Sequence, residues 1–244
     1  MTAIEIMAVS DVHSPRFLPL LISSVKSMLN YKPNIILMGG DMIDKGDVGS
    51  MKPLRDFLAS RFPGVPMVSV FGNEEYMEKI QVLRSMYNDI VWLDDEAWMN
   101  SINGVKLCVY GTRGSLERLT SWQKRNLPQL AEIFEKRVKN TMEALLKLRT
   151  DCEILILLMH YAPTTKTLKG EPENTYPYLC HRGYENVILS AKPDLVIHGH
   201  AHASVVHQSE VGGIPIFNVA IPAVKSVTRI RVEITGNRVK ISRT

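Results

Sequence analysis

Residues of types that can bind metal ions occur at five places along the sequence, and each place follows a short apolar run. Asp11 and His13 come first, and their spacing puts both side chains on one face of an extended segment. Carboxylate, imidazole and amide groups are common ligands of divalent ions in proteins. Seven such ligands are too many for one tetrahedral ion and suit two ions bridged by a carboxylate. The candidate ligands are Asp11, His13, Asp41, Asn73, His160, His200 and His202.

Each of these residues also has an ordinary structural interpretation. An isolated Asp-x-His pair arises often by chance, Asp41 after Gly40 fits a simple turn, and Asn73 after Gly72 fits another. A lone His160 fits a buried, hydrogen-bonded histidine. The least ambiguous signal is His200 and His202, because two imidazoles on one side of a short loop suit a transition metal. The whole ordered set at strand ends favours a metal site.

Short apolar strands alternate with amphipathic helices through most of the chain. Strands are expected at residues 4–9, 35–38, 65–70, 90–93, 105–110, 154–159, 195–198, 204–210, 215–219, 227–232 and 238–242. Helices are expected at 17–29, 54–58, 82–86 and 184–191, and over 116–149 with an interruption at Pro128. This order predicts an α/β fold with mixed sheets and helices outside. Ligand sites in such folds gather at the carboxyl ends of strands. We expect one domain, 1–244, with a helical insert at about 115–150.

The composition is that of a globular protein. The chain has 244 residues, of which 45% are hydrophobic and 22% are charged, and this balance excludes disorder and coiled coil. No apolar run approaches the roughly 20 residues that span a bilayer. Three scattered cysteines indicate neither a disulfide framework nor a thiolate metal site, so we expect a cytoplasmic protein. The net charge of +4 is compatible with an anionic partner and does not identify one.

Taken together, the motifs resemble those of the calcineurin-like metallophosphoesterases. The resemblance rests on five blocks: Asp11-x-His13, Gly40-Asp41-x-x-Asp44, Gly72-Asn73-x-Glu75, His160, and Gly199-His200-x-His202. It implies a four-layer αββα sandwich with two mixed β-sheets and a dinuclear metal centre at the strand ends. It further implies that Asp11, His13 and His202 hold one ion, that Asn73, His160 and His200 hold the other, and that Asp41 bridges them. Asp44 would orient its neighbours.

One position departs from the family pattern. Where the third block usually carries a histidine that assists the leaving group, this chain has Glu74, followed by Glu75 in the acidic position. A carboxylate beside two cations stays ionised and is a poor proton donor. His181 is therefore our first candidate to replace the histidine, and Arg113 is a candidate to bind phosphate bidentately. A surface histidine and an arginine paired with a carboxylate are the alternatives.

The resulting hypothesis is a hydrolase that cleaves a phosphoester of a small molecule or nucleotide, with a phosphodiester favoured. Attack would come from a hydroxide bridging two divalent ions, with Asp41, Asn73 and Glu74 beside the reacting group. Manganese, iron or zinc fits the ligands, and manganese is favoured. One alternative is a nuclease of the same chemistry, which the basic residues of the insert allow but which few interleaved aromatics support. The other is a metal-stabilised binding scaffold with little catalysis. The oligomeric state is open.

Overall fold

Two six-stranded sheets form the centre of the protein in the computed structural model, which describes residues 2–236 and 238–244. The first sheet has the order β12 (Arg238–Arg243), β11 (Thr228–Thr235), β1 (Thr2–Val9), β2 (Ile35–Met38), β3 (Met67–Val70) and β4 (Ile90–Leu93). The second has the order β5 (Glu96–Ile102), β6 (Val105–Thr112), β7 (Ile154–Met159), β8 (Leu195–His198), β10 (Ile214–Asn218) and β9 (Gln208–Val211). Both sheets are mixed: the first has antiparallel pairing on one side only, at β11 and β12, and the second has it at both edges, at β5 and β9.

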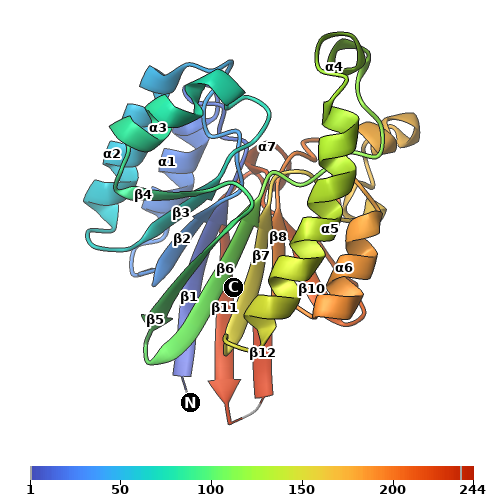
Figure 1. The fold of residues 1–244 in the computed structure, drawn as a ribbon. Coiled ribbons are helices and arrows are strands. Elements are labelled where there is room, and N and C mark those ends of the chain that lie inside the picture. Colours follow the sequence, from blue (N-terminus) through green and yellow to red (C-terminus); the bar gives the residue numbers. More distant parts are fainter. Residues whose placement is uncertain (1, 237) are drawn as a thin grey trace.

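Helices cover the outer face of each sheet (Figure 1). Helices α1 (Leu18–Ser27), α2 (Met51–Arg61) and α3 (Ile80–Met86) lie on the first sheet, and α5 (Leu130–Arg149) and α6 (Gly183–Ala191) lie on the second. The shorter helices are α4 (Ser121–Asn126), α7 (Ile221–Val224) and the 3-10 turns at Val48–Ser50, Met77–Lys79, Thr165–Thr167 and Glu173–Tyr178. The predicted αββα sandwich is therefore confirmed.

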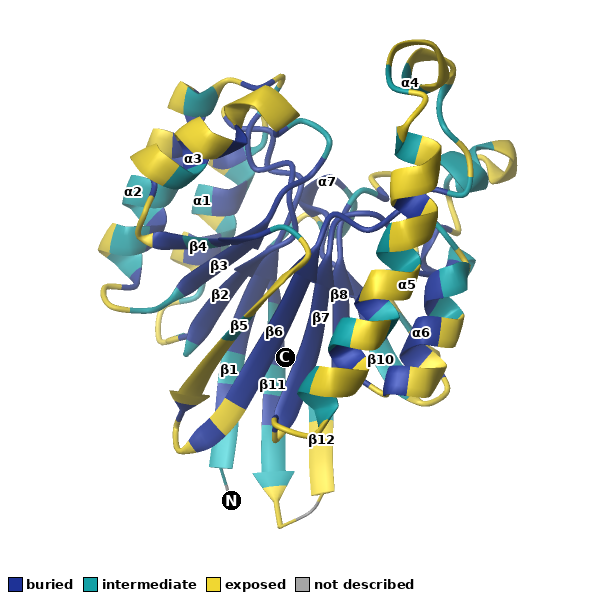
Figure 2. Ribbon diagram, viewed as in Figure 1, coloured by how far each residue is buried: buried dark blue, intermediate teal, exposed yellow. Residues whose placement is uncertain are grey.

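Three apolar interfaces hold these four layers together. Leu21 and Leu54 pack the first helical layer against its sheet, and Val187 packs the second helical layer against the other sheet. Between the sheets lies a third cluster, which includes Ile6 and Ile156. Strands β2 and β7 are buried along their whole length, as parallel strands covered on both faces should be (Figure 2).

The carboxyl ends of the parallel strands of both sheets meet at the upper edge in Figure 1. Strand β1 pairs in parallel with β2, and β2 with β3, so their three exit loops are neighbours. In the second sheet β7 and β8 are likewise parallel neighbours. The sheets thus bring all five ligand-bearing loops to one edge. None of the helices within the described ranges has both the length and the apolarity needed to cross a membrane.

Some elements differ from their predicted positions. Strand β5 was not expected, because this edge strand is largely exposed and lacks the apolar alternation that marks a strand. The expected strand at 204–210 begins later, at Gln208. In the insert, Pro128 separates α4 from α5 as predicted, since an interior proline breaks a helix.

The cysteine interpretation was wrong. Cys108 in β6 and Cys152 just before β7 form a disulfide across 44 residues of sequence, and Cys180 is free and buried. The three residues look scattered because the pairing depends on two neighbouring strands that are distant in the chain. One ground for expecting a cytoplasmic protein is thereby lost, since disulfides are rare in that compartment.

Helix α5 gives a direct test of the outer layer. Leu145 on this helix is fully buried, whereas Ile133 is 40% exposed. We expect Leu145→Ala to lower the free energy of unfolding by about 2–5 kcal/mol, because the truncation leaves a cavity. The matched Ile133→Ala change should stay within about 0.5 kcal/mol. Urea titrations of both variants measure the difference, and equal losses would contradict this packing.

Candidate metal centre

Six candidate ligands come together in two overlapping groups. One group contains Asp11, Asp41, His160 and His200, and the other contains Asp11, His13 and His202. Within each group the potential ligand atoms lie within 4.8 Å of one another. Asn73 joins the first group through its Oδ1, 3.1 Å from Nε2 of His160. The structure therefore brings together all seven candidate metal ligands that were predicted from the sequence.

Left-handed backbone conformations set these side chains in place. The φ angle is +57° at Asp11, +40° at His13, +52° at Asp41 and +68° at His200. Residues other than glycine seldom adopt such angles, although Asp and His do so more readily than most. Their concentration at four candidate ligands shows sharp turns directly after the strands. Strained backbone of this kind is typical of functional sites.

Glu75 ties the loops after β2 and β3 to each other. Its fully buried carboxylate accepts hydrogen bonds from the backbone N–H groups of Asp41 at 2.8 Å, Met42 at 2.7 Å and Gly72 at 2.7 Å. A longer bond of 3.2 Å comes from Ile43. Burial raises the pKa of this carboxyl, and the backbone donors oppose the rise. Glu75 was not predicted as a site residue. Its acidic position in the third block was the one feature of the sequence that could have indicated this role.

Gly72 packs closely against the side chain of Asp41. A Cβ atom on Gly72 would lie 2.1 Å from Oδ1 of Asp41, which is far inside van der Waals contact. The same Oδ1 accepts a 2.8 Å hydrogen bond from the backbone N–H of Glu74. The Asp41 carboxylate is thereby held with its Oδ2 toward the histidines: Nε2 of His13 is 3.8 Å away and Nε2 of His160 is 3.6 Å away.

The donor set fits divalent ions. Nε2 of His13 is buried and has no hydrogen-bond partner among the described residues, yet it faces carboxylate oxygens of Asp11 at 4.0 Å and Asp41 at 3.8 Å. A buried nitrogen without a partner is costly, and an ion between these atoms would remove that cost. On the other side of its ring, Nδ1 lies 3.6 Å from Asp44, which suits a carboxylate that orients a ligating imidazole.

The electrostatics of the site also favour cation binding. Burial raises the pKa of Asp41 well above its usual value, and the nearby carboxylates of Glu75 and Asp11 raise it further. For Asp11, burial also acts upward, but the hydrogen bond and charge of His202 outweigh it and hold the pKa low. Burial lowers the pKa of His160 to about 4, and it lowers the pKa of His200 as well. The neutral imidazoles of His160 and His200 are in the protonation state that ion binding requires, and a bound cation would favour the ionised form of Asp41.

Glu74 and Arg113 contact backbone groups around the site. The Glu74 carboxylate accepts a 2.8 Å bond from the N–H of Lys45 and a 3.2 Å bond from the Asn73 amide. The guanidinium of Arg113 donates to the carbonyl of Gly72 at 2.9 Å and to that of Glu75 at 3.3 Å. Arg113 is buried, and its Nε lies 3.5 Å from Asp94. In this arrangement both side chains hold the Asn73 loop.

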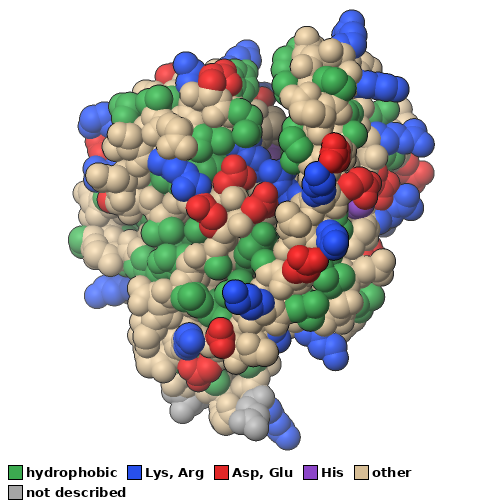
Figure 3. Space-filling model, viewed as in Figure 1, with side chains coloured by type: hydrophobic (Ala, Val, Ile, Leu, Met, Phe, Trp, Pro, Cys, Tyr) green, Lys and Arg blue, Asp and Glu red, His purple; other side chains and the backbone are tan. Residues whose placement is uncertain are grey.

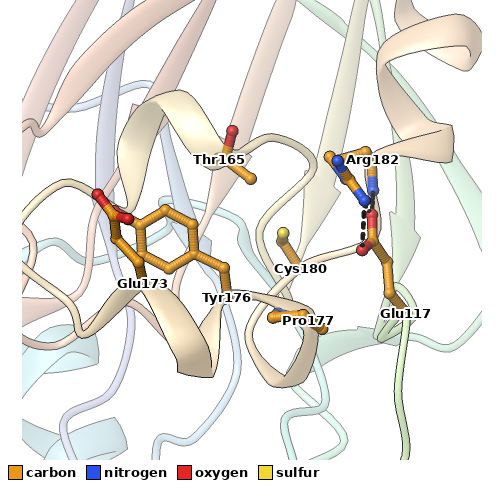
Figure 4. Close-up of a pocket in the computed structure, with 7 residues that line it drawn as sticks. All are labelled: Glu117, Thr165, Glu173, Tyr176, Pro177, Cys180 and Arg182. Atoms are coloured by element: carbon orange, nitrogen blue, oxygen red, sulfur yellow. Dashed lines mark hydrogen bonds and ion pairs between the residues drawn. The ribbon is translucent and has the colours of Figure 1, made fainter.

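The structure does not bring His181 into either ligand group. Its Nδ1 accepts a hydrogen bond from the N–H of Gly183 at 3.1 Å, and its Nε2 is 3.6 Å from Glu135 of helix α5. The neighbouring residues line a separate pocket of about 270 Å³ (Figure 4). An ion pair of Arg182 with Glu117, 2.6 Å long, forms one side of this pocket. The lining residues are Glu117, Thr165, Glu173, Tyr176, Pro177, Cys180 and Arg182, none of them a candidate ligand.

Gly72 allows a local test of the site. We expect Gly72→Ala to weaken Mn²⁺ binding at least about 10-fold, because the added methyl group displaces Asp41, and supporting residues of metal sites typically have effects of 10–100-fold. The control is Gly49→Ala, whose Cβ would meet only Oδ1 of Asp47 at 3.4 Å. Calorimetric titration with Mn²⁺ compares the two variants. Unchanged Mn²⁺ affinity in Gly72→Ala would show that the close contact between Gly72 and Asp41 does not control ion binding.

The buried histidines predict a pH dependence of stability. Burial lowers the pKa of His160 and of His198 to about 4 each, whereas an unfolded histidine titrates near 6.5. Between these values the unfolded chain binds protons that the folded chain does not, so ion-free protein should lose stability as the pH falls from about 6.5 to 4. The slope should approach about 1.4 kcal/mol per pH unit for each histidine. His198→Gln should reduce the slope by about 1.4 kcal/mol per pH unit in denaturant titrations with chelator present, and an unaltered slope would exclude His198.

Solved structures of similar fold include both enzymes and an anchor protein. A protein assigned as a 5′-nucleotidase from Staphylococcus aureus matches with a TM-score of 0.63 and 15% identity, over 99% of this chain and 53% of that one, so this chain spans about half its length. The phosphopantetheinyl hydrolase of Mycobacterium tuberculosis matches with a TM-score of 0.65 and 13% identity, over 89% of each chain. GAP50, the anchor in the inner membrane complex of Plasmodium, matches with a TM-score of 0.63 and 9% identity, over 100% of this chain and 84% of that one.

At these identities the structural matches show the fold alone. No curated protein matches the sequence. The family model of the calcineurin-like phosphoesterases, however, matches residues 4–204, which is most of the chain and includes every ligand-bearing loop from Asp11 to His202. The protein therefore belongs to the calcineurin-like phosphoesterase family.

Proposed function

We propose that the protein hydrolyses a phosphodiester of a small molecule or nucleotide at a centre of two divalent ions. Metal-dependent phosphoester hydrolysis is the chemistry of its family. The observation that carries the proposal is the overlap of the two ligand groups at Asp11, with Asp41 facing His13 of one group and His160 of the other. Two ions so placed would be close neighbours, as in two-metal hydrolases.

The ligands divide between two ions in this proposal. Asp11, His13 and His202 would hold the first, Asn73, His160 and His200 would hold the second, and Asp41 would be shared between them. When bound, such ions would supply Lewis acidity and make hydroxide available as a nucleophile near neutral pH. Oxygen ligands from Asp and Asn together with imidazoles suit manganese, which we favour over iron or zinc.

The surrounding side chains keep this geometry fixed while the ester reacts. Nδ1 of His160 is hydrogen-bonded to the carbonyl of Gly39 at 2.9 Å, which leaves Nε2 directed at the site. Asp11 accepts a 2.9 Å hydrogen bond from the backbone N–H of His200 and thereby holds the loop that carries His200 and His202. Preorganised ligands of this kind need no rearrangement when charge develops on the phosphoryl oxygens.

Glu74 is the reason for favouring a diester. It stands where the family usually has a histidine, and its negative charge is close enough to raise the pKa of Asp41. A phosphomonoester carries up to two negative charges and a phosphodiester only one, so repulsion from Glu74 disfavours the monoester more strongly. A substrate with a good leaving group needs least help from a general acid.

A second candidate is a metal-stabilised binding scaffold with little catalysis. Glu74 in the place of the histidine supports it, and the similar Plasmodium protein GAP50 is described as an anchor. A nuclease is not favoured. Several basic side chains of helix α5 and its surroundings are paired, with Lys136 bound to Glu132 at 2.6 Å and Arg137 to Asp95 at 2.8 Å. Figure 3 shows Lys and Arg mixed with Asp and Glu on the face in view.

The deciding experiment measures hydrolysis of bis-p-nitrophenyl phosphate and p-nitrophenyl phosphate by chelator-treated protein with Mn²⁺ restored. We expect release from the diester only with Mn²⁺, and a loss of at least about 100-fold in Asp41→Asn, because a ligand should matter more than the supporting residues of a metal site. The control is Asp56→Asn, an exposed acid on α2 that pairs with Lys52 and Arg55. Full activity without metal would overturn the mechanism, and ion binding without turnover on either ester would favour the scaffold.

A further inference from the structure

Tyr161 is a buried aromatic residue at the metal centre that the proposed chemistry does not use. It follows His160 directly at the end of β7 and is only 6% exposed. Its ring centroid lies 5.1 Å from that of His160, at an interplanar angle of 56°, and 4.8 Å from that of His200, at 80°. The two imidazoles themselves are 4.9 Å apart. The tyrosine ring thus contacts both histidines of one ligand group.

The same ring contacts the helical insert. Phe134 of α5 lies edge-to-face against Tyr161, with centroids 6.1 Å apart and an angle of 78°. Leu116 and Phe134 are buried with Tyr161 in one small apolar cluster. This cluster is separate from the three interfaces that hold the sheets and helices together. The insert therefore has its own packing contact with the residues beside the site.

Hydrogen bonds fix this contact on both sides. Ser115 donates to the carbonyl of Phe134 at 2.9 Å, and Arg137 of the same helix donates to the carbonyl of Gly114 at 3.1 Å. The backbone N–H of Tyr161 donates to the carbonyl of Arg113 at 3.0 Å. The segment after β6, the start of α5 and the end of β7 are therefore held at one separation. That separation sets the position of the tyrosine ring.

Backbone carbonyls help to orient both histidines: that of Gly39 for His160 and that of Tyr178 for His200. His160 is held at Nδ1 by the Gly39 carbonyl and is close to Asn73 at Nε2. His200 lies on a left-handed backbone with φ of +68°, and its ring packs against the rings of His160 and Tyr161. Ring contacts of this geometry stabilise one orientation of an aromatic side chain. The ring of Tyr161 therefore adds to the orientation of both imidazoles.

We propose that Tyr161 is a positioning residue for the imidazoles of His160 and His200, and that Phe134 supports it from the insert helix. The inference rests on the metal centre of the proposed function. The ring of Tyr161 carries this role and its hydroxyl does not, because the contacts to both histidines and to Phe134 are made by the ring. The insert thereby contributes to ion binding without supplying a ligand.

The test is Mn²⁺ affinity of the full chain, measured by calorimetry and by the electron paramagnetic resonance signal of bound Mn²⁺. Tyr161→Leu should weaken binding about 10-fold and broaden the bound signal, because two ring contacts are lost. Tyr161→Phe should bind Mn²⁺ with an affinity within about twofold of the wild type. Phe134→Leu, which keeps an apolar side chain in the cluster, should weaken binding about threefold and tests the same contact if Tyr161→Leu fails to fold. The control is Tyr110→Leu, which removes another buried tyrosine and should leave affinity unchanged.

The outcomes separate this inference from the function that it rests on. Wild-type affinity in Tyr161→Leu or Phe134→Leu would overturn the positioning role and leave the hydrolase proposal intact. An equal loss in Tyr161→Phe and Tyr161→Leu would overturn it too, since the hydroxyl would then be the active group. Ion binding by the wild type without ester hydrolysis, together with the expected affinity series, would refute the hydrolase and support the inference.

Discussion

The carboxylate of Glu75 is the contact on which the site depends most. Four backbone N–H groups from two loops converge on it, and Arg113 holds the carbonyl of the same residue. One buried side chain thus satisfies donors that a left-handed turn at Asp41 would otherwise leave without partners. The candidate ligands Asp41 and Asn73 lie on the two loops that it joins. Their relative position is therefore a property of the backbone more than of their own side chains.

Charge is the opposing constraint. Asp11, Asp41 and Glu75 are three carboxyl groups at or below 1% exposure, and burial disfavours their ionised forms. Among the imidazoles of the described residues, only that of His202 hydrogen-bonds to Asp11, while burial lowers the pKa of His160 and that of His200. The raised pKa values of Asp41 and Glu75 favour their protonated forms. A divalent cation beside them would favour the ionised forms, so ion binding and the stability of the loops would be linked.

The sequence predicted the layers, and it predicted which residues gather at the candidate site, because both follow from local rules. Apolar runs marked the buried strands, and polar residues directly after them, such as Asp11 and His160, marked the ends where a site forms. What it did not reveal depends on contacts between distant segments. The edge strand β5 has no apolar alternation of its own, Cys108 meets Cys152 only across paired strands, and the Glu75 carboxylate acts on a loop more than 30 residues earlier. His181 is in neither ligand group, its imidazole lies 3.6 Å from Glu135 of the insert, and its catalytic role stays a prediction.

The disulfide encloses the whole insert in a covalent ring. Cys108 lies in β6 beside Leu155 of β7, and Cys152 is two residues before β7 begins, so both ends of the ring are anchored on adjacent strands. Helices α4 and α5 lie between those anchors. Residues can accordingly be gained or lost near α4 without shifting the register of β6 against β7. The length and surface of the insert can therefore change while the strands that position His160 stay in place.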